Sequence, residues 1–201
     1  MKKVIFGTLL LINNLALTMQ QPARVYDQEK TLKLKSYLNV WQPKKDFPEE
    51  MEIRQLILDG ANPNVKADCG HAKDCTWLDS TIFYNDEKKF QDLIALLLFY
   101  GADTSDSDLF GRVCQLGTYT TVLLFICFGA KVAGKNARGL TPLGCAIGYS
   151  RMDVIKLLLD SGATSDIDIP NNEGETPLSC ASKKGTRDIV ALLELYKNKK
   201  S

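Results

Sequence analysis

The sequence predicts an all-α fold, a solenoid of about five stacked helix-turn-helix repeats. Three observations support this prediction. The tripeptide Thr-Pro-Leu stands at 141–143 and again at 176–178, an offset of 35 residues, and the residues around it are also similar. A Gly-Ala pair recurs at Gly60, Gly101, Gly129 and Gly162. Apolar residues between these markers follow helical spacing, and a fixed period of this length is typical of stacked repeats.

Residues 1–19 are expected to be a secretory signal peptide of bacterial type. Lys2 and Lys3 precede a mostly apolar run over 4–19, which matches the charged and hydrophobic regions of such a leader. The alternative is a membrane anchor, but the run is shorter than the roughly 20 residues that span a bilayer, and Asn13 and Asn14 interrupt it. We therefore expect a secreted or periplasmic protein with no stable membrane span after cleavage. Membrane anchoring through the uncleaved segment is the alternative.

A flexible lead-in, residues 20–29, is expected before the first repeat, residues 30–61. The helices of repeat 1 are predicted over 31–41 and 48–58, and this end of the stack can serve as a polar cap. Repeat 2, residues 62–102, has Thr76-Trp77-Leu78 in place of Thr-Pro-Leu and a second helix over 93–98. It carries insertions at 69–75 and 86–89, in turns where extra length costs little.

Repeat 3, residues 103–130, is predicted to have helices over 108–116 and 121–128. Asp108 follows Gly101 by seven positions, whereas Thr141 follows Gly129 by twelve. This shortening falls in the turn between repeats, so one projecting finger is expected to be missing. The apolar residues of the first helix that we expect to face inward are Phe110, Val113 and Leu116.

Repeats 4 and 5, residues 131–163 and 164–197, are the most regular. Thr141 can cap a helix that begins with Pro142, where the missing N–H of proline is harmless. Ala146 and Ala181 are small where two helices must approach closely. The second helix of repeat 4 carries an apolar stripe of Val154, Ile155, Leu158 and Leu159, and Gly162 can end it in the left-handed conformation.

These repeats resemble the ankyrin repeat, a unit of about 33 residues built as turn, helix, turn, helix. The resemblance covers residues 30–197 and is strongest over 130–196. The histidine usual after Thr-Pro-Leu is replaced by Gly144, Ser179 and, in repeat 2, Asp79. The hydrogen bonds of that histidine are therefore absent, and modest stability is expected. The missing and lengthened fingers also put a simple continuous groove in doubt.

The resemblance implies a non-enzymatic protein–protein interaction scaffold, expected to be a monomer, whose partner is a protein of unknown identity. In ankyrin repeats the turn tips and the first helices form the groove that holds the partner. Carried over to this chain, the candidate contact residues are Asn64, Lys66, Lys135, Asn136, Arg138, Ile147, Asp166, Asp168, Asn171, Glu173, Ser182 and Lys183.

Composition argues against nucleic-acid binding and against catalysis. Without residues 1–19 the chain loses two lysines, which leaves 23 basic against 24 acidic residues rather than a concentrated basic face. His71 is the single histidine, so most triads built on histidine are excluded. The glycines are spaced as helix stops and form no phosphate-binding loop. We assign no catalytic residue, no resident metal site and no cofactor.

The six cysteines fall into two groups. Cys145 and Cys180 occupy one position in successive repeats, about 8–10 Å apart, too far for a disulfide, and Cys114 and Cys127 are expected in the core. Cys69 and Cys75 bracket the inserted loop that contains His71. Three readings remain for this pair: a local disulfide, two unlinked thiols, or a metal site completed by His71 with Asp68 or Asp74. A metal-binding or redox role of this loop is the alternative function.

Overall fold

The computed structural model describes residues 25–40, 50–69, 72–83 and 87–199. The chain divides into two compact units, Met1–Asp103 and Thr104–Ser201, which we call unit 1 and unit 2. The boundary falls between predicted repeats 2 and 3. The expected signal peptide and most of the expected lead-in lie outside the described residues. Within the described residues, no helix is long and apolar enough to cross a membrane.

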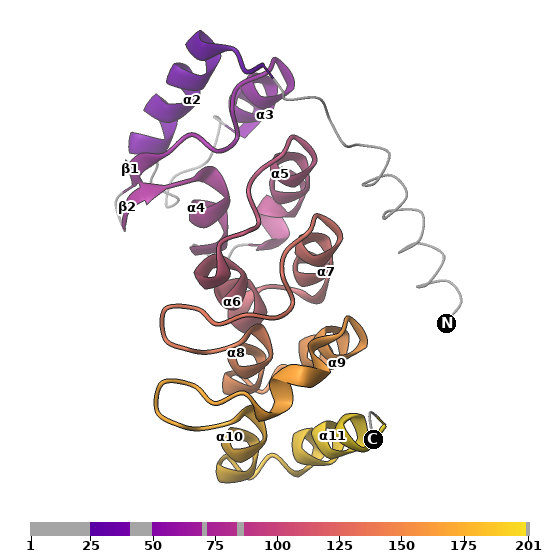
Figure 1. Ribbon diagram of the computed structural model, residues 1–201. Coiled ribbons are helices and arrows are strands. Elements are labelled where there is room, and N and C mark those ends of the chain that lie inside the picture. The colour runs from indigo at the N-terminus through magenta and orange to yellow at the C-terminus, as the bar shows by residue number, and fades with distance from the viewer. Residues whose placement is uncertain (1–24, 41–49, 70–71, 84–86, 200–201) are drawn as a thin grey trace, which may run out of the picture. The chain divides into compact units, whose positions relative to one another are not determined.

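Unit 1 contains the two predicted helix pairs of repeats 1 and 2 (Figure 1). Repeat 1 is α2 (Gln28–Val40) with α3 (Glu50–Leu58), and repeat 2 is α4 (Trp77–Phe83) with α5 (Glu87–Phe99). The first helix begins three residues earlier than predicted, because the Asp27 carboxylate accepts a hydrogen bond from the Lys30 amide at 3.0 Å and caps it. This bond is the main cause of the lowered pKa of Asp27.

The insertion at 69–75 forms strands that an all-α prediction did not contain. Strand β1 (Ala67–Cys69) pairs antiparallel with β2 (Ala72–Cys75), with Ala67 opposite Cys75 and Cys69 opposite Ala72. A disulfide joins Cys69 to Cys75, whose α-carbons lie 6.3 Å apart. Both cysteines are buried, and β1 packs against α2. The insertion is therefore part of the packed structure of unit 1.

Repeat 2 begins with a different cap from that of the regular repeats. The Asp79 carboxylate accepts hydrogen bonds from the Thr76 amide at 2.8 Å and its hydroxyl at 2.7 Å, while the Thr76 hydroxyl accepts one from the Asp79 amide at 3.2 Å. This reciprocal arrangement is a capping box. Trp77, where repeats 4 and 5 have proline, is fully buried and donates from Nε1 to the Leu34 carbonyl at 3.3 Å. Trp77 thereby joins repeat 2 to repeat 1.

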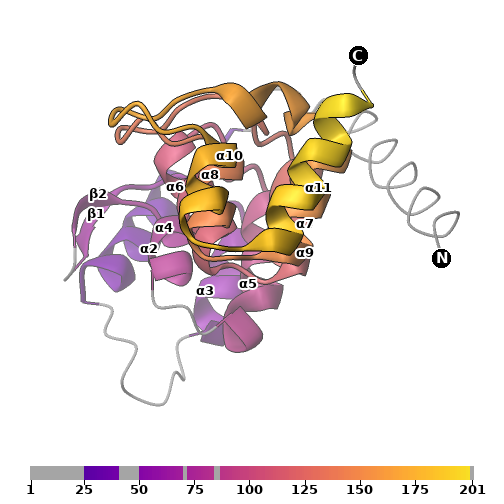
Figure 2. The same ribbon diagram turned by 90° about the horizontal axis from the view of Figure 1, so that it is seen from below.

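Unit 2 contains three helix pairs in two layers (Figures 1 and 2). The first helices, α6 (Ser107–Leu116), α8 (Pro142–Gly148) and α10 (Pro177–Lys183), form one layer. The second helices, α7 (Tyr119–Cys127), α9 (Met152–Asp160) and α11 (Arg187–Asn198), form the other. A short 3-10 helix, η1 (Ala163–Asp168), follows α9. The predicted solenoid of helix pairs is confirmed.

The predicted caps hold in unit 2. The Thr141 hydroxyl accepts a hydrogen bond from the Gly144 amide, and the Thr176 hydroxyl accepts one from the Ser179 amide, each at 3.1 Å. Gly162 has a φ of 107°, the left-handed conformation expected after α9. Helix α6 begins one residue earlier than predicted, at Ser107, and Asp106 caps it. The connection before it, residues 102–106, has no regular structure, in keeping with a missing finger.

The core of unit 2 uses small residues where the first helices meet. Ala146 and Ala181 are fully buried, and a Cβ on Gly111 would lie 3.2 Å from the Cys145 sulfur, so α6 lies close to α8. The rings of Phe110 and Phe125 stack at 6.0 Å between centroids. Three of the four free cysteines are buried, namely Cys114, Cys127 and Cys145, whereas Cys180 is half-buried. Leu116, expected to face inward, is also only half-buried.

Candidate partner-binding surface of unit 2

Two fingers project on the same side of unit 2 and lie next to each other in both ribbon views (Figures 1 and 2). The repeat-4 finger is residues 131–140, which lead into α8. The repeat-5 finger is residues 164–175, which include most of η1 and lead into α10. The repeat-5 finger is two residues longer than the corresponding connection of repeat 4, counted from Gly162 to Pro177 against Gly129 to Pro142.

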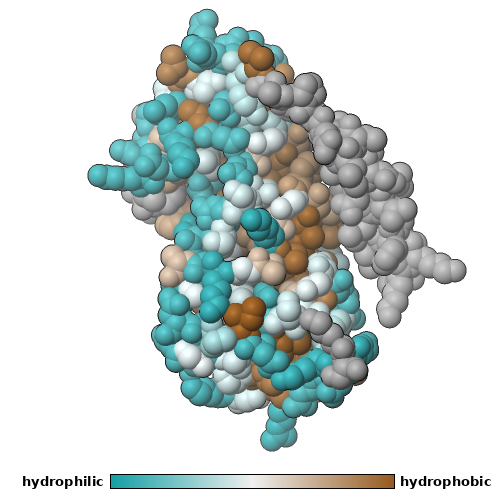
Figure 3. Space-filling model, in the orientation of Figure 1, coloured by the Kyte–Doolittle hydropathy of each residue, from teal (hydrophilic) through white to brown (hydrophobic). Residues whose placement is uncertain are grey.

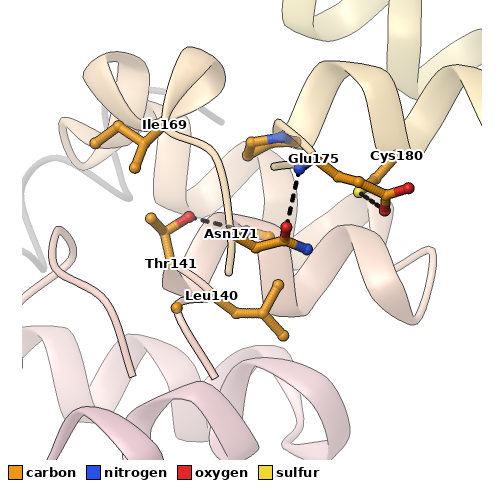
Figure 4. Close-up of a pocket in the computed structure, with 9 residues that line it drawn as sticks. Leu140, Thr141, Ile169, Asn171, Glu175 and Cys180 are labelled. Carbon is orange, nitrogen blue, oxygen red and sulfur yellow. Dashed lines mark hydrogen bonds between the residues drawn. The ribbon is translucent and has the colours of Figure 1, made fainter. Parts of the chain in front are cut away.

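An asparagine fixes the conformation of each finger. The Asn136 side-chain oxygen accepts from the amides of Arg138 at 3.1 Å and Leu140 at 2.9 Å. The Asn171 side-chain oxygen accepts from the amides of Glu173 and Glu175, each at 2.9 Å (Figure 4). Main-chain bonds from Asn136 to Leu140 and from Asn171 to Glu175 close both turns. The two asparagines satisfy backbone donors, so they set the shape of the surface.

The two fingers also contact each other. The Asn172 side-chain amide donates to the Ala137 carbonyl at 3.4 Å, and the Asp108 carboxylate accepts from the Ala137 amide at 3.0 Å. Gly139 has a φ of 72°, and a Cβ there would lie 2.8 Å from the backbone nitrogen of Asn172. The repeat-4 finger is therefore held between the start of α6 and the repeat-5 finger.

A small hollow lies at the base of the fingers, between α8 and α10 (Figure 4). Repeat 4 contributes Leu140, Thr141 and Gly144, and repeat 5 contributes Ile169, Asn171 and Cys180, among others. Leu140 and Ile169 are half-buried. Our sequence reasoning did not include these two apolar residues, although an apolar residue within a polar finger is a signal that could have indicated them.

The ionisable groups at the hollow are engaged with one another. Glu175 forms an ion pair with Lys183 and accepts a hydrogen bond from the Cys180 thiol at 3.3 Å. The hydrogen bond from Lys183 is the main cause of the lowered pKa of Glu175 and of the raised pKa of Lys183. Burial, followed by the hydrogen bond to Glu175, raises the pKa of the Cys180 thiol. Cys180 is therefore a protonated thiol and a poor nucleophile at neutral pH.

Residues 110–201 match the family model described as ankyrin repeats, in three copies. This part of the chain therefore consists of ankyrin repeats. Over 65 residues the chain is 38% identical to an ankyrin repeat protein of Rickettsia bellii, and over 78 residues it is 35% identical to an ankyrin repeat and KH domain-containing protein of Caenorhabditis briggsae. These alignments cover 32% and 38% of this chain, and 38% and 3% of the relatives.

Ankyrin repeats form protein–protein interaction domains, and proteins built from them are generally non-enzymatic scaffolds. In the ankyrin repeats of unit 2 the first helices and fingers form one continuous side, over which hydrophilic side chains are common (Figure 3). The candidate contacts that are exposed on this unit are Lys135, Arg138, Asp168, Glu173, Ser182 and Lys183. Asp168 is paired with Lys197 at 2.7 Å and Lys183 with Glu175.

Three predicted contact residues are corrected, because their side chains are buried. Ile147 is 0% exposed, since it faces the core from α8. Asp166 is 1% exposed, because it lies on the buried side of η1. Asn136 is 8% exposed and binds the backbone of its own finger. None of the three can offer its side chain to a partner, and half-buried Asn171 is mainly a finger-shaping residue.

The two candidates in unit 1 differ in role. Lys66 is exposed, just before β1. Asn64 is half-buried and links two parts of repeat 2, since its side chain donates to the Gly101 carbonyl at 2.8 Å and accepts from the Asp103 amide at 2.7 Å. Asn64 is therefore a structural residue of unit 1, whereas Lys66 remains available for contact.

Cys69 and Cys75 form a disulfide, which was the first of the three alternatives for this pair. A disulfide leaves no thiolate for a metal. Among the described residues no three of His, Cys, Asp and Glu are grouped so that they could hold a metal ion, and His71 lies outside them. The geometry of the described part of the loop is that of a disulfide-linked hairpin.

Proposed function

We propose that this chain is an exported, non-enzymatic scaffold that binds a protein partner on the fingers and first helices of unit 2. The observation that carries the proposal is the pair of fingers fixed by Asn136 and Asn171 and joined through Asn172. A surface whose backbone is already ordered loses little conformational entropy on binding. Exposed charged tips beside a partly apolar hollow give such a surface both polar and apolar contacts.

The chemistry at the hollow favours binding over catalysis. Its thiol, Cys180, has a raised pKa, and its carboxylate, Glu175, is neutralised by Lys183. An acid–base or nucleophilic site needs a group whose pKa and access are tuned toward reaction. Here the same interactions hold α10 and the finger in place.

Export is supported by two features. The charged and apolar segment at 1–19 has the pattern of a cleaved leader, and the Cys69–Cys75 disulfide is of the kind that persists in an oxidising compartment. The test is the mass of the protein recovered from a bacterial host after fractionation. A chain shortened by about 19 residues in the periplasm or medium supports export. A full-length chain in the membrane fraction would favour the anchor, and a full-length chain in the cytoplasm would reject both.

We assign the Cys69–Cys75 disulfide a structural role. Both cysteines are buried, and the hairpin that they close packs against α2. Metal analysis and thiol counting with and without reductant test this assignment. Stoichiometric zinc that is lost in His71→Ala would contradict it and restore the metal-binding alternative.

The binding surface can be tested with two glutamine substitutions, one at the hollow in α8 and one on a second helix. Gly144 lines the hollow, and a Cβ there would make only ordinary contacts at 3.6 Å with Leu140 and Thr141. Lys156 is exposed on the second helix α9, outside the proposed surface. We expect Gly144→Gln to fill the hollow and lose partners that crosslink to the full chain, whereas Lys156→Gln keeps them.

Equal recovery of partners by both variants would contradict the proposed surface. Circular dichroism should show that helix content is retained in both variants, because glutamine is a good helix former.

A further inference from the structure

The repeat-4 finger carries three positive charges and no negative charge of its own, and the Asp108 carboxylate at the start of α6 accepts from its Ala137 amide. Lys131, Lys135 and Arg138 are all exposed, and residues 131–140 contain no acidic residue. Among the described residues, no ion pair within 4 Å involves any of these three cations. By contrast, the exposed Lys183 on α10 forms an ion pair with Glu175.

The repeat-5 finger has the opposite composition, but most of its charge is used within the fold. It contains four acidic residues and no basic one. Asp166 is buried, Asp168 pairs with Lys197, and Glu175 pairs with Lys183. Glu173 is the exposed acidic residue at the tip, and in the described part of the chain it forms no ion pair within 4 Å.

Arg138 and Glu173 occupy the same position in successive fingers. Each stands two residues after the asparagine that shapes its finger and directly before a glycine of positive φ, Gly139 or Gly174. The fingers touch through Asn172 and Ala137, so the two opposite charges lie on adjacent tips. The fingers lead into the packed helices α8 and α10, and packed helices lie about 8–10 Å apart, which is about three residues of an extended chain at 3.3 Å each.

We propose that unit 2 recognises an extended segment of its protein partner in which acidic residues face Lys131, Lys135 and Arg138, and a basic residue about three positions away faces Glu173. This inference rests on the proposed function, because it assumes that the fingers are the binding surface. Complementary charge steers the encounter and fixes the register, while a segment with the opposite pattern meets like charges.

The experiment is a selection of random peptides displayed on phage against the full chain, followed by affinity measurements with the selected synthetic peptides. The wild type should select Asp and Glu clusters with Lys or Arg about three positions away. Lys135→Glu with Arg138→Glu should weaken the selected peptides about tenfold, as expected for exposed attractions turned into repulsions. Glu173→Lys should change the selected flanking residue from basic to acidic.

Lys156→Glu with Arg187→Glu is the matched control. Both residues are exposed on second helices of unit 2, and the double substitution changes the charge by the same amount. We expect no more than a twofold change in affinity for this variant, because charges farther than the screening length of about 8 Å act weakly. An equal loss in the control and in the finger variant would overturn the proposal, since net charge would then explain the binding.

The remaining outcomes separate this inference from the proposed function. If the selected peptides no longer bind Gly144→Gln but bind the Lys135→Glu/Arg138→Glu variant normally, the charge pattern is wrong and the proposed binding surface still stands. If the peptides bind both variants as well as they bind the wild type, both the charge pattern and the proposed binding surface are wrong. Selection without acidic enrichment also overturns the charge pattern. If a single-stranded RNA oligonucleotide at equal concentration competes with the peptides, the proposal is wrong and the repeat-4 finger binds a nucleic acid instead.

Discussion

Unit 1 and unit 2 stabilise similar helix pairs by different means. Repeats 4 and 5 in unit 2 use a threonine cap, a proline in the first turn and a buried alanine. Repeat 2 in unit 1 uses a capping box, a buried tryptophan and a disulfide-linked hairpin. In unit 2 the stability is spread over repeated small contributions, whereas in unit 1 it is concentrated in a few large ones. Single substitutions should therefore have larger effects in unit 1.

The largest effect is expected for Trp77→Ala. Trp77 is fully buried and donates to the Leu34 carbonyl, so its removal leaves a large cavity and loses this hydrogen bond. We expect unit 1 to lose about 3–5 kcal/mol of its free energy of unfolding. Hydrogen exchange measured by mass spectrometry can follow the two units separately.

The counterpart of Trp77 in unit 2 is Pro142, and Pro142→Ala should cost less than about 1 kcal/mol, because alanine also suits the first turn of a helix. Similar losses in the two variants would contradict the contrast between concentrated and distributed stability.

In unit 2, the addition of one methyl group at Gly139 should lower the free energy of unfolding substantially. Gly139→Ala must adopt a positive φ and also displace Asn172, whereas Gly174→Ala, at the same position of the next finger, has a similar φ and no atom within 4 Å of its Cβ. We expect losses of about 2–3 kcal/mol for Gly139→Ala and about 1 kcal/mol for Gly174→Ala in denaturant titrations. Equal losses would mean that the finger-to-finger contact contributes little to stability.

Removal of the disulfide should destabilise unit 1 alone. The Cys69–Cys75 bond closes a short loop, with a sequence separation of 6, so the chain-entropy effect is about 2 kcal/mol. Cys69→Ser with Cys75→Ser should speed hydrogen exchange in α2 and the hairpin and leave unit 2 unchanged. Cys114→Ser is a control for loss of a buried free cysteine in unit 2.

The smallest effect concerns Asp166 and depends on pH. Burial raises the pKa of Asp166, and its Oδ2 has no hydrogen-bond partner in the described structure. The folded state therefore holds a proton more tightly than the unfolded state. As a result, the free energy of unfolding falls as pH rises from about 4 through the folded pKa.

Asp166→Asn removes this charge. We expect a gain of about 1 kcal/mol at pH 7 and no gain at pH 3, measured by denaturant titration at both values. A gain of the same size at both pH values would show that desolvation of the charged form is not the cause.

Several helix ends were predictable because they depend on local residues, but α5 begins at Glu87 rather than at 93, so residues 87–89 of the expected insertion are helical. Thr141 before Pro142 and Gly162 before Ala163 act through their own backbone, and the structure has both where the sequence placed them. Helix α6 begins at Ser107, one residue before the predicted start, and the Asp106 carboxylate caps it by accepting from the amides of Asp108 and Leu109.

The contact residues were less predictable. The sequence identifies finger residues, but it does not show which of them turn inward. Asn136 is turned inward by hydrogen bonds to its own finger, and Asp166 by its place in the 3-10 helix η1. The strands β1 and β2 were missed because segments of three and four residues carry too little periodicity to indicate a hairpin.

The four free cysteines differ in burial, so they should also differ in their rates of reaction with an alkylating reagent. Cys114, Cys127 and Cys145 are shielded by the core, while the half-buried Cys180 lines the hollow between α8 and α10. An alkylating reagent should label Cys180 first, slowly at neutral pH and faster at alkaline pH because its pKa is raised. A bound partner that fills the hollow should protect this thiol, so the rate of alkylation reports occupancy without any engineered probe.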